Sequence, residues 1–387
     1  MSQHPLHVGI VAGEPSGDRL GAGLIQAVRE HVPDAVFEGI GGSRMVEAGC
    51  FSLHPMEKLS VMGFTDVMWR LPGLVAIRRD LRRHFLETPP DIFIGVDAPD
   101  FNLPLERHLK AAGIRTLHYV SPAVWAWRGY RLRGIARAID CMLVLFPFEE
   151  ACYSEQGIPV RCVGHPLADT LADEVDPLEA RRHLGLDPHG KLVALLPGSR
   201  IDEVRRLADP FILAAMWCHE RRIDTRFVVP LTTSACRDLF ERRLRRLHCR
   251  VPMTLLNGKS LEAMAACDAA LLASGTATLE CLLLKRPMVV AYRLSPLSYR
   301  LAKRLVRTRY FSLPNLLSGE PLVREMIQNE VRPEKLGREL LNLIDQPQRR
   351  QRLVEAFSVI HEDLRRDANR KVAGAVFELL GRDEHLV

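Results

Sequence analysis

The residues best suited to chemistry lie in two short segments in the second half of the chain. Each segment follows an apolar run and precedes a helix-forming stretch; one contains Gly198, Ser199 and Arg200, and the other Ser274, Gly275 and Thr276. Backbone N–H groups in such a turn, at the positive end of a helix, favour a phosphate. Arg200 adds a guanidinium that can bind two phosphate oxygens. The alternative is simple helix capping, with Arg200 at the surface.

Together the two segments predict a site for a nucleotide diphosphate that needs no metal ion. Negative charge builds on the diphosphate when a nucleotide–sugar bond breaks, and an arginine can stabilise that charge. Glu280, which lies in the helix-forming stretch after Thr276, can accept hydrogen bonds from ribose hydroxyls; otherwise it is a solvated helix residue. The sequence contains no H-E-x-x-H, no D-x-D and no paired His/Cys spacing, so it gives no support to a metal site.

A carboxylate follows a strongly apolar run in the first half of the chain. Asp97 comes directly after Asp91–Val96. Ligands of open α/β sheets bind beyond the carboxyl ends of the strands, so Asp97 is well placed to act as a general base. An apolar surrounding would raise its pKa toward the working range. The alternative is that Asp97 or Asp100 caps the next helix, and Asp100 is the better placed of the two for that task.

The turn after the first apolar run, Ala12–Asp18, is a second candidate site in this half. Gly13 and Gly17 allow a tight turn and a close approach to a ligand, and Ser16 or Asp18 can cap the following helix. Such a turn suits a phosphate or sugar hydroxyls, and Glu14 is a carboxylate with no structural task there. The alternative is a plain strand-to-helix turn.

Further segments fit a lipid or sugar ligand, each with a packing alternative. Trp125, Trp127 and Arg128 can form a wall for a sugar or an acyl chain, or pack in the core. Asn315 can bind a sugar or phosphate, or belong to a turn. The segments Val61–Arg79 and Tyr299–Arg307 combine apolar and basic residues, which suits an anionic membrane surface. For both segments the alternative is a packed helix with solvated charges.

Short apolar runs alternate with helix-period segments, which predicts two α/β domains, each with a parallel sheet. We expect the first domain to span residues 1–170 and the second 171–344, with a helical return to the first over about 345–387. The expected strands are His7–Ala12, Asp91–Val96, Arg115–Tyr119, Cys141–Leu145, Val160–Val163, Leu192–Leu196, Arg226–Pro230, Met253–Leu256, Ala269–Ala273 and Met288–Ala291.

Composition narrows the function class. The 387 residues have a net charge of +6, which suits an anionic partner, but no aromatic-interleaved basic motif predicts nucleic-acid binding. Nine cysteines without a C-x-x-C pair indicate a reducing compartment. We expect neither a secretory signal nor a bilayer-spanning segment, since no run of about 18 apolar residues occurs.

At these motifs the chain resembles the lipid A disaccharide synthase family of Gram-negative bacteria. The resemblance spans nearly the whole chain, with the motifs in the family's order, and Pro15 stands where threonine is common. The segments that carry it are Val11–Asp18, Val96–Asn102, Tyr119–Trp127, Leu195–Arg200, Leu271–Glu280 and Ser312–Leu317.

The resemblance implies a GT-B glycosyltransferase fold, in which two Rossmann-like domains face a cleft. It implies an inverting transfer, without cofactor, from UDP-2,3-diacylglucosamine to 2,3-diacylglucosamine 1-phosphate, which forms a β-1,6 link and releases UDP. Asp97 matches the family's proposed base, Arg200, Glu280 and Asn315 its nucleotide site, and Glu14 and Ser16, beside Gly17, its first-domain site.

The resemblance also implies a cytoplasmic enzyme that is peripheral on the anionic inner membrane, and a family associated with dimers. Two other functions remain open at this stage. An epimerase acting on UDP-N-acetylglucosamine shares the two-domain design but has no need of the apolar–basic segment Val61–Arg79. A non-catalytic nucleotide-binding regulator would bind UDP without turnover and would give Asp97 no role.

Overall fold

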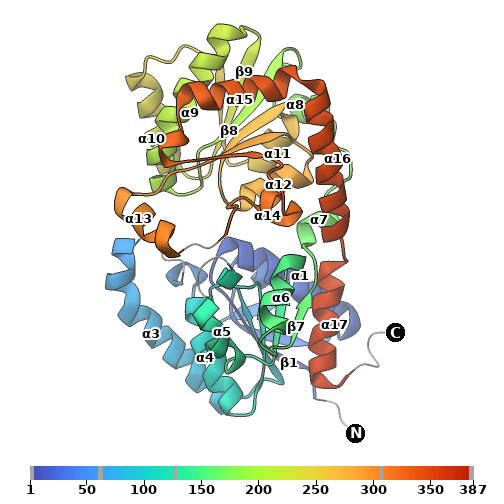
Figure 1. Cartoon of the computed structure of the whole chain (residues 1–387). Coiled ribbons are helices and arrows are strands. Elements are labelled where there is room, and N and C mark those ends of the chain that lie inside the picture. The colour runs from blue at the N-terminus through green and yellow to red at the C-terminus, as the bar shows by residue number, and fades with distance from the viewer. Residues whose placement is uncertain (1–3, 60–63, 126–128, 306–307, 383–387) are drawn as a thin grey trace. The chain divides into compact units, whose positions relative to one another are not determined.

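The computed structural model describes residues 4–59, 64–125, 129–305 and 308–382. The chain divides into a first unit, Met1–Asp169 with Leu364–Val387, and a second unit, Thr170–Asp363 (Figure 1). The return to the first unit therefore starts at Leu364, whereas the sequence analysis placed it near residue 345. The reason is that helix α16 (Pro347–Leu364) belongs almost entirely to the second unit, and only α17 (Ala368–Leu380) packs in the first.

The first unit contains a seven-stranded parallel sheet in the order β3-β2-β1-β4-β5-β6-β7. Its strands are β1 (His7–Ala12), β2 (Val36–Ile40), β3 (Cys50–Ser52), β4 (Ile92–Val96), β5 (Arg115–Tyr119), β6 (Cys141–Val144) and β7 (Val160–Cys162). The sequence analysis predicted five of them and missed β2 and β3. These two strands are short, carry Glu38 and Ser52, and have exposed residues, so they lack the continuous apolar run of a central strand.

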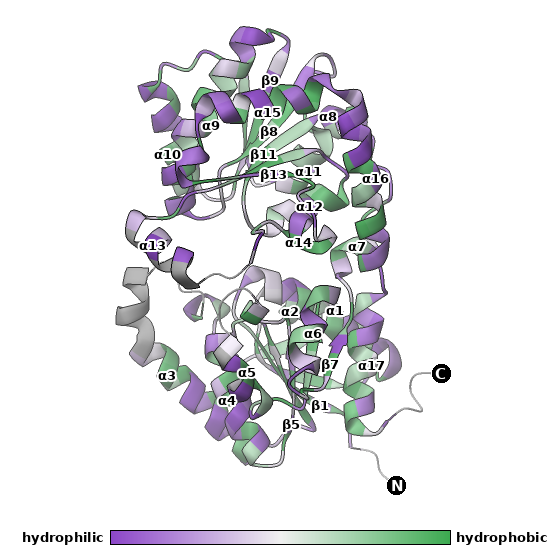
Figure 2. Cartoon of the chain, in the orientation of Figure 1, coloured by the Kyte–Doolittle hydropathy of each residue, from purple (hydrophilic) through white to green (hydrophobic). Residues whose placement is uncertain are grey.

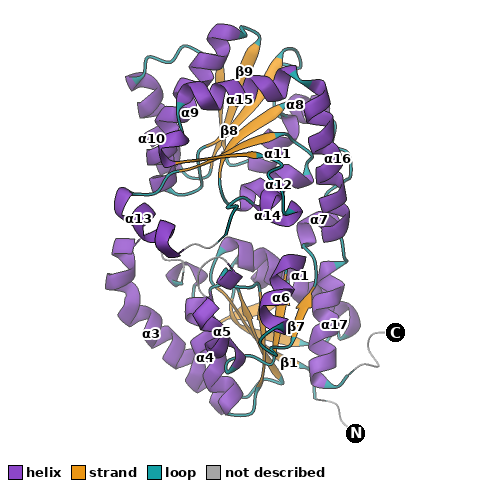
Figure 3. Ribbon diagram, in the orientation of Figure 1, coloured by secondary structure: helices purple, strands orange, loops and turns teal. Residues whose placement is uncertain are grey.

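Helices surround this sheet (Figure 3). They are α1 (Pro15–His31), α2 (Ser43–Glu47), α3 (Phe64–Glu87), α4 (Pro99–Ala111), α5 (Leu132–Ala136), α6 (Pro147–Ser154) and α17, with α7 (Pro166–Thr170) at the unit boundary and the 3-10 turns η1 (Met56–Lys58) and η3 (Gly129–Arg131). Successive residues of β4 enter different cores. Ile92 and Ile94 pack with α1 and α17, whereas Phe93 packs with α3 and α4. Burial on both faces explains why β4 is apolar throughout.

The second unit contains a six-stranded parallel sheet in the order β10-β9-β8-β11-β12-β13. Its strands are β8 (Lys191–Leu196), β9 (Thr225–Leu231), β10 (Met253–Asn257), β11 (Ala269–Ala273), β12 (Met288–Tyr292) and β13 (Arg324–Ile327). All but β13 were predicted. Strand β13 begins with the polar residues Arg324 and Glu325 and is only partly buried, so it lacks the continuous apolar run of a central strand.

The helices of the second unit are α8 (Pro177–His183), α9 (Ile201–Arg221), α10 (Ser234–Arg246), α11 (Ser260–Ala266), α12 (Thr276–Leu283), α13 (Pro296–Leu305), α14 (Leu313–Ser318), α15 (Pro333–Asp345) and α16, with the 3-10 turn η4 (Gln328–Glu330). Hydropathy colouring shows apolar strands such as β8 and mixed, largely polar outer helices such as α10 (Figure 2). Among the described residues, no helix has the length and apolar character needed to cross a bilayer.

Candidate active site

A cavity of about 400 Å³ lies at the carboxyl ends of the central strands of the second unit. Strands β8 and β11 are direct neighbours, so the loops that follow them meet at one edge of the sheet. Seven of the eight residues predicted for nucleotide binding line this cavity: Gly198, Ser199, Arg200, Ser274, Gly275, Thr276 and Glu280. The fold therefore brings together two motifs that are more than 70 residues apart in the chain.

The loop after β8 is held by a carboxylate of helix α9. The Glu203 side chain accepts hydrogen bonds from the N–H groups of Ser199 (3.0 Å) and Arg200 (3.3 Å). Gly198 has a φ of +125°, and a Cβ there would lie 2.4 Å from the Cβ of Glu203, so only glycine fits without strain. Ser199 does not cap α9; Glu203 does. The Arg200 guanidinium belongs to an exposed residue at the mouth of the cavity.

The loop after β11 is fixed by its own hydroxyl groups. The Ser274 hydroxyl donates to the carbonyl of Phe311 (2.9 Å), and the Thr278 hydroxyl donates to the carbonyl of Gly275 (2.7 Å). Gly275 and Thr276 are exposed at the cavity, whereas Glu280 is half-buried. These contacts leave the loop backbone facing the cavity, as a ligand with phosphate or hydroxyl groups requires.

The sequence analysis missed several residues that line the same cavity. Tyr292 is the last residue of β12, and burial raises the pKa of its hydroxyl. Thr232 and Ser260 supply two more polar side chains. In the sequence, these residues are marked only by their position just beyond an apolar run or at a helix start. Many other residues share that position, so it does not identify them.

Asn315 does not line the cavity. It is 1% exposed, its amide nitrogen donates to the carbonyl of Val323 (3.0 Å), and its amide oxygen accepts from the N–H of the same residue (2.8 Å). The Asn315 side chain thus satisfies both backbone hydrogen-bonding groups of Val323, as a neighbouring strand would. The geometry supports the turn interpretation of this residue over nucleotide binding.

Asp97 lies at the carboxyl end of β4 in the first unit, in an unusual backbone conformation. Asp97 and Ala98 have φ values of 53° and 44°, a left-handed region that non-glycine residues rarely adopt. Two contacts hold the turn: the Asp97 N–H donates to the carbonyl of Tyr119 (2.8 Å), and the Asn102 amide donates to the carbonyl of Asp97 (2.8 Å).

Burial raises the pKa of the Asp97 carboxyl, while a hydrogen bond from the Ala98 N–H and the nearby His118 act in the opposite direction. A carboxylate with few water contacts is a stronger proton acceptor, as a general base requires. The N-cap position of α4 is occupied by Ala98, so neither Asp97 nor Asp100 stands at the capping position. Asp100 instead forms an ion pair with Arg131.

The predicted turn after β1 lies against Asp97. Strands β1 and β4 pair in parallel, and a Cβ on Gly13 would lie 2.8 Å from the Cβ of Ala98. Glu14 is exposed, Ser16 is half-buried, and a Cβ on Gly17 would lie 3.3 Å from the carbonyl of Val96. The edge that carries Asp97 therefore carries these three residues as well.

The predicted caps of helix α1 are wrong. Its N-cap position is occupied by Glu14, so Ser16 and Asp18 lie within the first turn of the helix. The Asp18 carboxylate accepts hydrogen bonds from the N–H groups of Gly42 (2.8 Å), Arg44 (3.2 Å) and Met45 (3.0 Å), which begin α2. Asp18 thus stabilises the loop after β2 rather than its own helix.

Trp125 takes part in an aromatic cluster of the first unit. Its ring meets Phe148 edge-on with 5.2 Å between centroids, and Phe148 stacks on Phe146. Trp125 also donates a hydrogen bond to the Glu149 carboxyl group. Burial raises the pKa of that carboxyl to about 7. Trp127 and Arg128 lie outside the described residues. So do residues 61–63 of the segment Val61–Arg79 and residues 306–307 of the segment Tyr299–Arg307.

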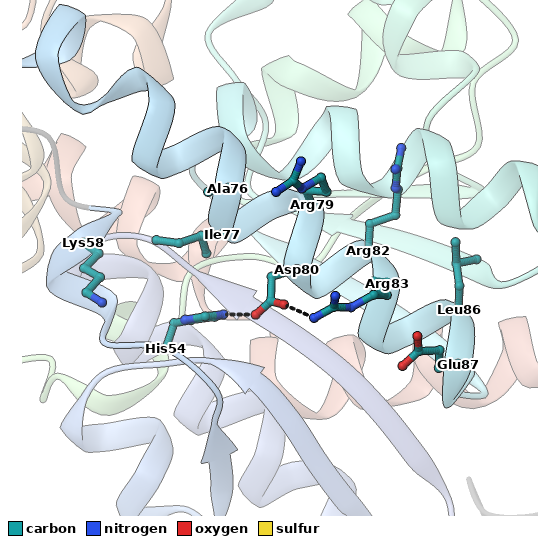
Figure 4. Close-up of a pocket in the computed structure, with 10 residues that line it drawn as sticks. All are labelled: His54, Lys58, Ala76, Ile77, Arg79, Asp80, Arg82, Arg83, Leu86 and Glu87. Carbon is teal, nitrogen blue, oxygen red and sulfur yellow. Dashed lines mark hydrogen bonds and ion pairs between the residues drawn. The ribbon is translucent and has the colours of Figure 1, made fainter.

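A wider hollow of about 780 Å³ lies along α3 in the first unit, and Ala76, Ile77 and Arg79 of the segment Val61–Arg79 help to line it (Figure 4). Asp80 occupies its centre, with one carboxylate oxygen 2.9 Å from His54 Nε2 and the other 2.8 Å from the Arg83 guanidinium. In Figure 4, Arg79 and Arg82 point away from His54. The cations do not converge on one point, and the hollow is therefore no second catalytic candidate.

The described residues contain no group of three or more His, Cys, Asp or Glu side chains that could hold a metal ion. The side chains of the cavity and the carboxylates of the first unit are of the types that the sequence predicts for a nucleotide-sugar site. Known proteins provide a separate comparison. The family model described as "Lipid-A-disaccharide synthetase" matches residues 8–377.

The chain belongs to this family. A lipid-A-disaccharide synthase of Hahella chejuensis is 49% identical over 380 residues, which cover 98% of this chain and 96% of the relative. One from Pseudomonas aeruginosa strain UCBPP-PA14 is 51% identical over 377 residues, with coverage of 97% and 99%. The match therefore includes both units and every loop of the site.

Solved structures share the two-unit fold at low sequence identity. An epimerase from Listeria monocytogenes, named as a putative UDP-N-acetylglucosamine 2-epimerase, has a TM-score of 0.67 and 13% identity, with 97% of each chain covered. The glycotransferase of kitacinnamycin has a TM-score of 0.61 and 15% identity, with coverage of 97% and 100%. The predicted fold class is confirmed, and the likeness to epimerases extends to the fold alone.

Proposed function

We propose that this protein is an inverting glycosyltransferase of lipid A assembly. It joins UDP-2,3-diacylglucosamine to 2,3-diacylglucosamine 1-phosphate, and the products are the β-1,6-linked disaccharide 1-phosphate and UDP. The observation that carries the proposal is the cavity at the carboxyl edge of the second sheet, where Arg200, Glu280 and two Gly/Ser loops meet in a chain of this family.

The second unit binds the nucleotide sugar in this proposal. The loop of Ser274, Gly275 and Thr276 and the loop of Gly198 and Ser199 surround the diphosphate, and Arg200 supplies the cation. Glu280 accepts hydrogen bonds from the ribose. Because the N–H groups of Ser199 and Arg200 already donate to Glu203, the diphosphate either binds beside that carboxylate or displaces it.

The first unit binds the acceptor and supplies the base. Asp97 takes the proton of the acceptor's 6-hydroxyl group while the hydroxyl oxygen attacks the anomeric carbon of the donor sugar. The bond from that carbon to the diphosphate breaks at the same time. The donor is α-linked, so a direct displacement gives the β product. Glu14, Ser16 and Gly17 orient the acceptor beside this base. Arg200 balances the charge on the departing UDP.

The membrane partner follows from the substrates, since both carry acyl chains. We propose a peripheral enzyme on the cytoplasmic side of the inner membrane, with an anionic lipid surface as partner and a second copy of the chain as a further partner. The net charge of +6 supports attraction to anionic lipid.

The proposal is tested by the release of UDP from UDP-2,3-diacylglucosamine in detergent and EDTA, with and without the monosaccharide 1-phosphate. We expect release that depends on the acceptor and persists in EDTA. Release without acceptor, or none, would favour an epimerase, which the same preparation would reveal on UDP-N-acetylglucosamine. Loss of activity in EDTA would contradict a metal-independent mechanism.

A further inference from the structure

A buried histidine and a buried glutamate lie behind Asp97. His118 on β5 and Glu106 on α4 are both 0% exposed, and His118 Nδ1 lies 2.8 Å from Glu106 Oε1. Neither His118 Nε2 nor Glu106 Oε2 has a hydrogen-bond partner among the described residues. Burying two such groups with half of their hydrogen-bonding capacity unused is costly, so their presence needs an explanation beyond packing.

The backbone makes room for this pair. Gly95 pairs with His118 across β4 and β5, and a Cβ on Gly95 would lie 2.2 Å from Glu106 Oε1. Glycine therefore leaves the space in which the carboxyl group approaches the imidazole. Gly95 is two residues before Asp97, so the pair lies directly beneath the turn that carries the candidate base.

The pair is coupled to Asp97 electrostatically and through the backbone. The residue after His118, Tyr119, accepts the N–H of Asp97 through its carbonyl (2.8 Å). His118 lowers the pKa of Asp97 and also that of Glu106, while burial raises both. Other charged groups in the surrounding elements are Glu14 on the loop after β1, and Asp100, which pairs with Arg131.

We propose that His118, held by Glu106, is a positioning residue that balances the charge of the Asp97 carboxylate from inside the sheet. It touches neither substrate, and it acts only through the base. The inference rests on the proposed transferase function, because it assigns the pair a task in that reaction. Burial raises the pKa of Asp97 and His118 opposes that rise, so the pair favours the deprotonated carboxylate that a base requires.

The test compares the pH dependence of kcat/KM in the wild type with that of His118→Asn and His118→Gln. The amide of Asn replaces Nδ1 and the amide of Gln replaces Nε2, and neither amide can carry a charge. A base works only when deprotonated, so its rate falls as the pH drops through its pKa. We expect the acidic limb of both variants to move upward by about one pH unit, with activity recovered at alkaline pH.

A merely structural role predicts a different result, namely a uniform loss of rate with the acidic limb in its wild-type position. That result in both variants would overturn the inference, as would wild-type profiles. His108→Gln is the matched control, because His108 is exposed on α4, the helix that carries Glu106, and its ring forms a hydrogen bond with the carbonyl of Pro104. Its profile should match the wild type.

The wild-type profile also separates the inference from the proposed function. If the wild type shows no acceptor-dependent release of UDP, the proposed function fails before any variant is compared. If the wild type does release UDP in this way and the acidic limb of both variants stays in its wild-type position, only the role of His118 fails. Thermal unfolding followed by circular dichroism shows that each variant is folded; if one amide does not fold, the other decides the outcome.

Discussion

Among single residues, Asp97 is the proposed general base. Replacing Asp97 with Asn keeps the shape of the turn but removes the proton acceptor. We expect kcat to fall by roughly 100-fold or more, since a general base contributes about that much. Affinity for UDP, measured by calorimetry, should remain, because the nucleotide cavity lies in the other unit. Turnover at the wild-type rate would remove Asp97 from the role of base.

Arg200 is the second residue whose chemistry can be isolated. Arg200→Ala should weaken UDP binding by roughly 10- to 100-fold, because hydrogen bonds to a charged group contribute about 1.5–3 kcal/mol each. The rate should fall as well. Arg205→Ala is the control, since Arg205 lies on the same helix and pairs with Asp202 at the surface (2.5 Å). Unchanged UDP affinity in Arg200→Ala would mean that the diphosphate binds elsewhere.

At the scale of elements, the loops depend on side chains that replace backbone partners. Asn315 satisfies both backbone groups of the buried Val323. We expect Asn315→Ala to lower the free energy of unfolding by about 1–3 kcal/mol, because these two groups lose their partners. Denaturant unfolding measures this loss. UDP affinity should stay near the wild-type value, and a stable variant that no longer binds UDP would restore Asn315 to the nucleotide site.

At the scale of the whole molecule, the C-terminal helix completes the core of the first unit. Phe377 of α17 is 0% exposed in that core, whereas Val359 of α16 is 68% exposed in the second unit. We expect Phe377→Ala to destabilise the first unit by about 3–5 kcal/mol and Val359→Ala to change little. Thermal unfolding with and without UDP distinguishes the units, since saturating nucleotide should stabilise only the second, by about 2.7 kcal/mol at 100 times its Kd. A shift of both transitions by UDP would contradict this assignment.

The sequence alone predicts most strands of both sheets and the edge at which the two loops of the cavity meet. Ten of the thirteen strands could be predicted, because a strand buried on both faces must be apolar throughout, as β4 and β11 are. The loops of Arg200 and Glu280 follow such strands, so their place at one sheet edge could be predicted too. The weakly apolar strands β2, β3 and β13 could not, because they lie toward sheet edges and have partly exposed residues.

The partner of each polar side chain depends on packing between elements that are distant in the sequence. Asp18 has the sequence position of a helix cap, yet it binds the start of α2, 24 residues further along the chain. Asn315 has the neighbours of a ligand-binding amide, yet it bonds to Val323. The pairing of His118 with Glu106 depends on a glycine in the adjacent strand. Local pattern specifies an element and its exposed face, but a hydrogen bond needs two groups within about 3 Å, and only packing sets that distance.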